Sequence, residues 1–406
     1  MIDHNIRSTN ETENKIIKNI IIGCTFAFVF CSTFSIAFSQ IAYFSGLVLW
    51  LFLVVRKTDA IEKTPLDTYF IIYLFLEAFT TIFAFNSFDA LMHIQKRLLL
   101  IPVVYVMVRF ADSRERILKL IITLFVSATV VGFFSTISIL VDFSDYSHYI
   151  KRFGLYNHYM TIGGLSMFMI LLMTPFALHP KTPIRVRLLS IVGIGFILFT
   201  LLFTFTRSSW LAVIAGIFII ALIRYKKIVI VFIALAIGVV LFGSPELHMR
   251  FISIFDPNDP TNSERFRMWS LGFQIFRDHP LLGIGDVNLM AVSRLYSHSS
   301  FGFGHAHNNI VMWFVTLGVI GFTFILFWFI KIWKIFWKTF RDAKDDWLFG
   351  SFTVGAIAAF VGFHVNGMFE WNFGDAEIFM MFWIIVSLVI SIKKIIEREN
   401  VPVSVR

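Results

Sequence analysis

Apolar runs of about 20 residues recur along the whole chain, and they restrict its fold more than any other feature. A run of this length crosses the hydrocarbon core of a bilayer as a helix. With 57% hydrophobic residues and 50 phenylalanines among 406 residues, a soluble domain could not bury its apolar surface. The pattern predicts an all-α integral membrane protein with about twelve transmembrane helices. The predicted spans are 16–37, 39–55, 66–85, 97–110, 117–140, 159–178, 188–205, 209–223, 228–243, 307–330, 347–365 and 375–392.

Lysine and arginine are distributed unevenly between the two ends of these spans. With the N-terminus in the cytoplasm, 25 of the 35 basic residues fall on the cytoplasmic side. This bias predicts that both termini are cytoplasmic. The net charge of +9 is then mostly a signal of topology and of contact with anionic membrane lipids. It does not indicate a nucleic-acid partner, and no nucleic acid is expected.

One long polar stretch, from Gly243 to Trp313, interrupts the apolar pattern in the second half of the chain. It contains five of the eleven histidines, and we expect the chemistry to take place there. It divides the chain into three parts. We predict nine spans in 1–243, an external loop and helix segment in 244–306, and three spans with a cytoplasmic tail in 307–406.

The external segment is expected to contain its own helix. Thr261-Asn-Ser-Glu264 has the form of a capping box and predicts the helix start, and Asp278-His279-Pro280 predicts its end. Aromatic residues at helical spacing predict an amphipathic helix on the membrane surface; they are Phe266, Trp269, Phe273 and Phe276. Arg265 and Arg267 lie in its first turns, where the helix dipole also favours an anion. The alternative is ordinary surface charge on an interfacial helix.

Arg207 follows the seventh predicted span so closely that it is held at the external membrane interface. A guanidinium there is costly unless it is paired or functional. Its planar donors match phosphate oxygens two at a time, which predicts binding of a phosphate or diphosphate. The alternative is that Arg207 reaches up to lipid headgroups with no further role.

His305-Ala-His307-Asn308 leads into the tenth predicted span from the external side. A histidine beside amides at a helix start can act as a general base near neutral pH. One alternative is a cluster that only caps the helix. Another is a metal site, because His-x-His can chelate a metal ion, but further ligands at a known spacing do not follow.

Glu370 lies on the same external face, after the eleventh predicted span. It could orient a base or bind the substrate. The alternative is that Glu370 only pairs with one of the arginines and takes no part in catalysis.

Three stretches of the chain resemble the superfamily of bacterial O-antigen ligases and O-antigen polymerases. They are the sequence TRSSWLA at 206–212, the run from Ser263 to Gly285, and the sequence HNNIVMWFVTLGVIGF at 307–322. The resemblance covers about half of the chain, from the seventh span onward. Phe369-Glu370 resembles an element of the ligase branch, although Met368 stands before it.

The resemblance implies a membrane glycosyltransferase of GT-C-like architecture in the bacterial inner membrane, with its active site on the periplasmic face. Its donor would be an undecaprenyl-diphosphate-linked glycan, and for the ligase branch its acceptor would be a sugar of lipid A–core. The resemblance further implies that His307, Arg207 and Arg265 are essential and that neither a metal nor a cofactor is needed. Arg267, Asn308, Glu370 and His305 are expected to contact substrate.

Two other functions compete with an O-antigen ligase. An O-antigen or polysaccharide polymerase would extend the lipid-linked glycan instead of transferring it to another lipid. A transporter of the same lipid-linked glycan belongs to a different class and would need charged or broken helices near the middle of the bilayer. Glu77 is the main charged residue inside the predicted spans, and the polar residues gather on one face, which favours an enzyme.

Overall fold

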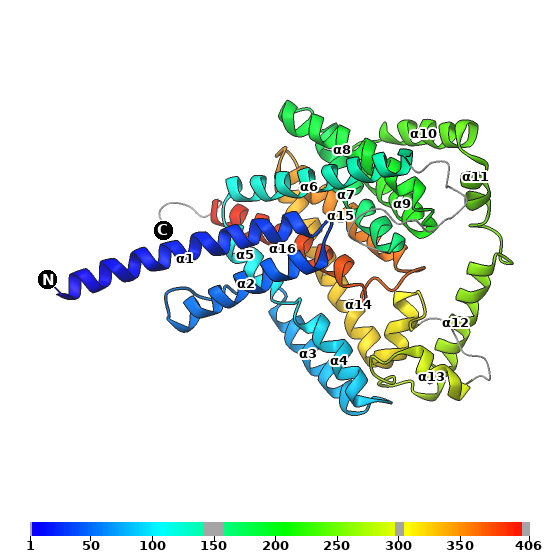
Figure 1. The fold of residues 1–406 in the computed structure, drawn as a ribbon, viewed down its shortest axis with the longest axis horizontal. Helices are drawn as coiled ribbons and strands as arrows, with labels where there is room; N and C mark the ends of the chain where they lie inside the picture. The colour runs from blue at the N-terminus through cyan, green and yellow to red at the C-terminus, as the bar shows by residue number, and fades with distance from the viewer. Residues whose placement is uncertain (1, 142–157, 297–303, 400–406) are drawn as a thin grey trace.

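The protein was analysed as a computed structural model that describes residues 2–141, 158–296 and 304–399. The described chain is all α-helical and contains sixteen helices (Figure 1). The first eight are α1 Ile2–Cys31, α2 Ile36–Val55, α3 Asp67–Ile82, α4 Ser87–Leu98, α5 Val103–Phe110, α6 Arg114–Val141, α7 Tyr159–Leu178 and α8 Ile184–Phe203. The others are α9 Arg207–Ile223, α10 Ile228–Phe242, α11 Pro245–Ile252, α12 Pro260–Asp278, α13 Leu289–Tyr296, α14 Asn309–Ala343, α15 Phe349–Asn366 and α16 Ala376–Glu399.

Eight of these helices are long and apolar enough to cross a membrane, so the chain is a multi-pass membrane protein. They are α1, α2, α6, α7, α8, α14, α15 and α16. The other four predicted spans are shorter than a full crossing. α9 has 17 residues, α3 has 16 and α10 has 15.

The prediction of a span at 97–110 is wrong. α4 ends at Leu98 and α5 begins at Val103, so the range contains a break instead of one continuous helix. With eight residues, α5 is about 12 Å long, which is less than half the hydrocarbon thickness. The apolar run misled the prediction because periodicity does not show that the chain turns at Leu99–Pro102.

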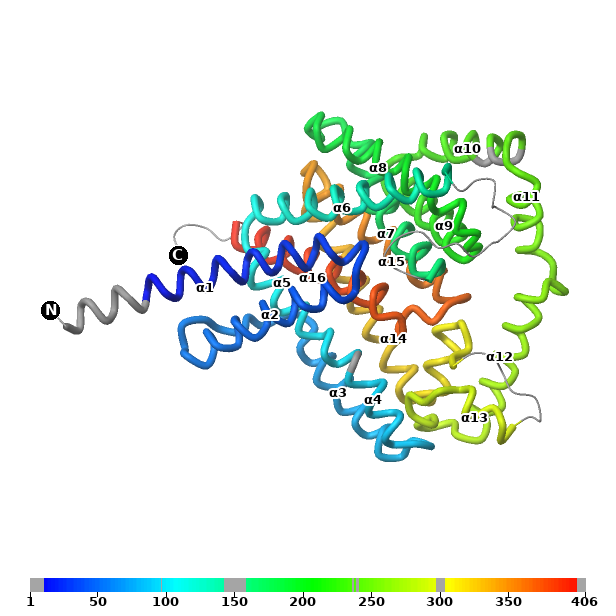
Figure 2. Tube along the Cα trace, in the orientation of Figure 1, coloured from blue at the N-terminus to red at the C-terminus, as the bar shows by residue number. Residues whose placement is uncertain are grey.

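The best-buried helices are α7, α15 and α16, and α15 packs against α7 and α9. α1, α2 and α8 lie further out and expose apolar side chains along much of their length, as helices that face lipid do. The trace of the chain shows that the N-terminal part of α1 and the end of α16 lie at one end of the molecule (Figure 2). α11, α12 and α13 lie at the opposite end, as expected if both termini share one side of a membrane.

α14 is broken at Gly318, where φ is +62°. The helix carbonyls that lose their partners there accept from the loop before α13: the Ile284 N–H donates to Val315 O over 2.8 Å. In return the Val319 N–H donates to Pro280 O over 2.8 Å. This reciprocal exchange, which we call the α14 clasp (residues 280–285 with 315–320), satisfies backbone groups that a broken helix would leave unpaired.

Arg97, one of the basic residues that the topology places on the external side, is buried and paired. Its guanidinium contacts the carboxylates of Glu77 on α3 and Asp286, which follows the clasp. The Phe85 N–H also donates to Ile284 O over 3.0 Å. The α3–α4 hairpin is thus tied to the external segment, and Arg97 has a structural reason to be there.

Candidate functional site

Arg207 is the first residue of α9, and its guanidinium is buried against the start of α12. Nη1 donates to the backbone oxygen and the hydroxyl of Ser253, at 2.6 and 2.8 Å. Nη2 donates to Asp259 Oδ1 at 3.1 Å and to Asn262 Oδ1 at 2.9 Å. Four of the five N–H donors of Arg207 are therefore engaged with this turn. The guanidinium of Arg207, which was predicted to bind a diphosphate, is therefore bonded to protein groups in this structure.

The rest of the motif around Arg207 fixes neighbouring helices. Asn366, at the end of α15, donates to the hydroxyls of Ser208 and Ser209, at 3.3 and 2.9 Å. The indole of Trp210 donates to Leu201 O of α8 at 3.0 Å. Arg207, the two serines and Trp210 thus anchor α9 to three different neighbours at one corner of the bundle.

α12 begins one residue before the predicted capping box. Its N-cap is Asp259, whose carboxylate accepts from the N–H groups of Thr261 and Asn262, and Pro260 occupies the first helical position. The prediction of Thr261 as the cap is wrong, because Asp259 already satisfies these donors. The end at Asp278 is confirmed, and Phe266 and Phe273 are exposed, as on an interfacial helix.

Arg265 lies on the inward face of α12 and is only 9% exposed. No hydrogen bond or ion pair of its guanidinium is found among the residues that the structure describes. Burial lowers the pKa of Arg265, the nearby Glu370 opposes that shift, and Arg207 adds to it. A buried arginine without a direct partner is costly, so Arg265 is the guanidinium here that is available to an anionic ligand.

His307 forms a close pair with Glu370. The two side chains meet at 2.8 Å between His307 Nδ1 and Glu370 Oε1, and His307 is 6% exposed. Burial would raise the pKa of Glu370, but the hydrogen bond and charge of His307, with the charges of His305 and Arg265, lower it to about 2. Glu370 is therefore ionised and can only accept, so His307 Nδ1 is the donor of this hydrogen bond.

The two arginines and the histidine pair are brought to one place. Asn262, which accepts from Arg207, lies one turn before Arg265 on α12. One turn further along, the indole of Trp269 donates to Ala306 O at 3.0 Å, next to His307. The ring of Trp269 also packs beside Phe369, the neighbour of Glu370, with 6.4 Å between ring centroids. α12 is thus the element that connects the candidate residues.

Two predicted residues have other roles. Asn308 is the N-cap of α14: its oxygen accepts from Ile310 and Val311, and its amide donates to Met368 O at 2.8 Å. Both ends of its side chain are engaged by the protein, and substrate binding by Asn308 stays a prediction. The side chain of Arg267 is 54% exposed and paired with Glu264, so the structure does not bring it into the cluster.

Two of the rare non-glycine residues with positive φ flank the cluster. Phe205, two residues before Arg207, has φ +52°, and His307 itself has φ +45°. Such conformations cost about 1–2 kcal/mol each and persist where the surroundings enforce them. They turn the chain sharply next to Arg207 and at His307, so they help to set the direction of both side chains.

His305, His307 and Glu370 also form a group that could hold a metal ion. Their ligand atoms all lie within 4.8 Å of one another. Sequence spacing did not reveal Glu370 as the third ligand, because it is 63 residues from His307. Burial, with the charge of His307, lowers the pKa of His305 to about 4, so His305 is neutral and able to coordinate at neutral pH. This arrangement allows two kinds of site: a general base, formed by His307 and oriented by Glu370, or a metal site formed by all three residues.

Two cavities open beside the cluster. The smaller, of about 160 Å³, is lined by Arg265, Asn262, Trp269 and Phe369, with apolar residues of the α11–α12 turn. The larger, of about 620 Å³, is lined by Glu370 and His305 together with residues of α2, α7 and α16. These cavities could not be predicted from the sequence, since their walls come from distant segments.

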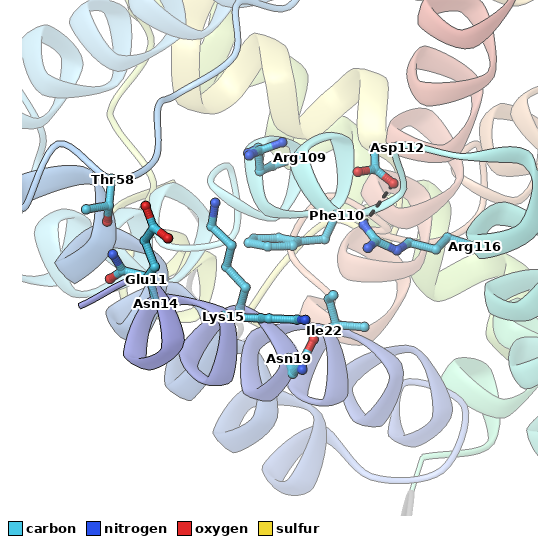
Figure 3. A pocket seen from close by; sticks show the side chains of 11 residues that line it. Glu11, Asn14, Lys15, Asn19, Ile22, Thr58, Arg109, Phe110, Asp112 and Arg116 are labelled. Atoms are coloured by element: carbon cyan, nitrogen blue, oxygen red, sulfur yellow. Dashed lines mark hydrogen bonds and ion pairs between the residues drawn. The ribbon is translucent and has the colours of Figure 1, made fainter. Parts of the chain in front are cut away.

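A third cavity, of about 490 Å³, lies around the N-terminal part of α1, at the other end of the molecule (Figure 3). Its basic residues are Lys15, Lys18, Arg109 and Arg116, all of which the charge bias assigns to the cytoplasmic side. Arg116 is paired with Asp112 at 2.8 Å. The cavity is consistent with the predicted topology and is remote from the cluster.

The comparisons with known proteins concern the middle of the chain. No curated protein matches the chain. Residues 192–326 match the family model described as O-antigen ligase. That segment runs from within α8 to within α14 and contains Arg207, Arg265 and His307, whereas Glu370 lies beyond it. The chain is therefore a multi-pass membrane protein that contains a domain of the O-antigen ligase family.

Proposed function

We propose that this protein is an O-antigen ligase. It would transfer a glycan from undecaprenyl diphosphate to a sugar of lipid A–core at the periplasmic face of the bacterial inner membrane. The observation that carries this proposal is the buried, unpaired Arg265 beside the ionised Glu370 and its partner His307. A positive charge and an oriented base side by side suit the departure of a diphosphate and the attack of a hydroxyl.

The proposed reaction is one displacement at the anomeric carbon. The acceptor hydroxyl gives its proton to His307 Nε2, and its oxygen forms the new bond to the anomeric carbon. The bond from that carbon to the diphosphate oxygen breaks, and the electron pair leaves with the diphosphate. Attack from the opposite face inverts the configuration. Glu370 keeps the imidazole oriented and stabilises its charge after proton transfer.

Arg265 and Arg207 have different parts in this proposal. Arg265 stabilises the negative charge that grows on the leaving diphosphate. Arg207 acts through α12: it holds the start of that helix by four hydrogen bonds and so keeps Arg265 in place. A metal is not required, because the guanidinium supplies the charge that a metal supplies in other transferases.

His307→Ala tests the base. The variant is expected to insert into the membrane at the normal level and to lose transfer by at least about 100-fold. Transfer at the wild-type rate would remove His307 from the reaction. Dialysis against EDTA separates the two chemistries of His305, His307 and Glu370: activity that survives supports the base, and activity that is lost and restored by a divalent ion supports the metal.

Complementation separates ligase from polymerase. Plasmid copies of the chain are placed in a ligase-null strain and in a polymerase-null strain, and lipopolysaccharide ladders are compared on gels. Restored ligation in the first strain alone supports our proposal, and restored chain extension in the second supports the polymerase. A transporter would leave donor and acceptor covalently unchanged. It is disfavoured because Glu77, the charge inside the predicted spans, is paired with Arg97.

A further inference from the structure

The two cavities beside the cluster differ in charge. Among the residues that the structure describes, Arg265 is the one charged residue that lines the smaller cavity. The described lining of the larger cavity includes three acidic side chains, of Glu370, Asp375 and Glu377, and no lysine or arginine. The two cavities are neighbours, because Phe369 lines the smaller one and the next residue, Glu370, lines the larger one. A diphosphate is attracted to the first and repelled by the second.

We propose that the larger cavity is the acceptor subsite and that it takes a hydroxyl-bearing sugar without negative charge. This inference rests on the proposed transferase function and adds the location and chemical class of the acceptor. The donor diphosphate then lies on the Arg265 side, so the two substrates approach His307 from different cavities. An acidic or phosphorylated sugar is repelled from the larger cavity by the carboxylates of Glu370 and Asp375.

The polar groups of this cavity suit hydroxyl groups. Glu370 Oε1 accepts from His307, whereas Glu370 Oε2 is buried and has no hydrogen-bond partner among the described residues. A buried carboxylate oxygen is costly until it accepts a bond, and a sugar hydroxyl can donate one. Oε2 therefore offers a contact for the acceptor next to the base.

Asp375 and Glu377 have different tasks in the same wall. Asp375 is the cap of α16, accepting from the N–H groups of Glu377 and Ile378, and it also accepts from the Thr161 hydroxyl at 2.7 Å. Its oxygens are thus engaged by the protein. Glu377, in the first turn of α16, lines the cavity without serving as this cap, which makes it the residue to change in an experiment.

The apolar part of the lining indicates how a lipid-anchored acceptor would reach the cavity. Ile36 and Phe44 of α2 and Leu99 after α4 contribute to it, and Leu99 is 50% exposed. In a chain that crosses the bilayer, exposed leucine beside a polar cavity faces lipid. The acceptor lipid can therefore stay in the membrane beside α2 while its sugar enters. Trp371 offers an indole on which the sugar ring can pack.

Cysteine protection locates each substrate without relying on turnover. In the full-length protein with Cys24→Ala and Cys31→Ala, Gln40→Cys reports on the larger cavity and Phe266→Cys on the smaller. The probes are lipopolysaccharide without O-polysaccharide and an undecaprenyl-diphosphate-linked polysaccharide. Near saturation, lipopolysaccharide should slow maleimide labelling of Gln40→Cys roughly tenfold, and the donor should do so at Phe266→Cys. Gln274→Cys, exposed on α12, is the control that neither should protect.

Glu377→Gln tests the same subsite through kinetics. It should raise the KM for lipopolysaccharide roughly tenfold and leave the KM for the donor unchanged, because the hydroxyl contact to the Glu377 carboxyl group is weakened. Glu264→Gln, on α12 outside both cavities, is the matched control and should change neither.

The outcomes separate the two proposals. Protection of Gln40→Cys by the donor overturns the acceptor subsite, as does transfer by Glu377→Gln with an unchanged KM for lipopolysaccharide. If lipopolysaccharide protects Gln40→Cys but the wild-type protein transfers no glycan, the binding site stands and the proposed reaction fails. If the wild type transfers glycan but lipopolysaccharide does not protect Gln40→Cys, the acceptor binds elsewhere and the proposed reaction stands.

Discussion

Arg207 and Arg265 are both buried, at 6% and 9% exposure, yet their surroundings differ. Arg207 donates four hydrogen bonds to the turn before α12. Arg265 has no such bonds among the described residues and is influenced through its charge, chiefly by Glu370 and Arg207. A satisfied guanidinium is suited to hold structure, and an unsatisfied one is suited to receive a ligand. The two roles can be separated by measuring stability and transfer together.

Arg265→Lys is expected to fold normally and to transfer about 100- to 1000-fold more slowly. A compact ammonium keeps the charge but loses the planar donors that match a diphosphate. The measurement is the transfer rate of purified protein, with thermal unfolding in detergent as the check on folding. Arg267→Lys, two residues along the same helix and exposed, is the control and should transfer at the wild-type rate. Equal losses in both variants would contradict the separate role of Arg265.

Arg207→Lys is expected to lose both stability and transfer. Breaking a buried pair strands Asp259 and Asn262 and costs about 3–5 kcal/mol. Thermal unfolding should therefore begin at a lower temperature, and protease cleavage between α11 and α12 should speed up. A variant that keeps its stability and loses only transfer would show that Arg207 meets the donor directly.

At the scale of elements, the external segment is held in place by backbone hydrogen bonds as well as by side chains. The α14 clasp joins a broken helix to the loop that follows α12, and Arg97 joins that loop to the α3–α4 hairpin. Because His307 immediately precedes α14 and Arg265 lies on α12, the clasp fixes the distance between the base and the guanidinium. The helix break at Gly318 thus has a structural purpose.

Gly283→Ala should open the clasp. Gly283 has φ +68°, and a Cβ there would lie 2.3 Å from Val315 O, so strain and overlap together should cost several kcal/mol, about 2 or more. Thermal unfolding and transfer should both be impaired. Gly195→Ala is the control, since a Cβ at Gly195 meets nothing within 4 Å. Similar behaviour of the two variants would argue against the clasp.

At the scale of the whole molecule, the basic cavity beside α1 and the candidate site beside α12 lie at opposite ends. The N-terminal part of α1 and the end of α16 lie at one end, where the basic cavity of Figure 3 is found. α11 to α13 lie at the other end, with α12 carrying Arg265. One side of the membrane would therefore carry the lipid-contacting cations, and the other the site.

This orientation predicts which residues an impermeant reagent can reach. In spheroplasts of cells carrying the cysteine-free chain, a membrane-impermeant maleimide should label Gln274→Cys on α12. It should label Lys338→Cys, near the end of α14, only after lysis. The basic residues near the ends of the predicted spans set this direction. Labelling in the reverse order would place the candidate site in the cytoplasm and contradict the proposed use of a periplasmic donor.

The sequence determined the class of fold and much of the site. The length and continuity of the apolar runs predicted the membrane helices. A chain in a bilayer must pair its backbone N–H and C=O groups within its own helix and expose apolar side chains to lipid. The motifs around Arg207, Arg265 and His307 pointed to side chains that can bind a diphosphate or act as a general base. The helix that begins near Thr261 and its end at Asp278 followed from local spacing, and its location on the membrane surface stays a prediction.

Only the tertiary structure decided which partners these residues have. The cap at Asp259, the pairing of His307 with Glu370 and the commitment of Asn308 to α14 join residues through contacts, some of them far apart in sequence. The same holds for the break between α4 and α5, which an apolar run conceals. Local propensity carries no information about which distant carboxylate reaches a buried cation, because that depends on how the helices pack.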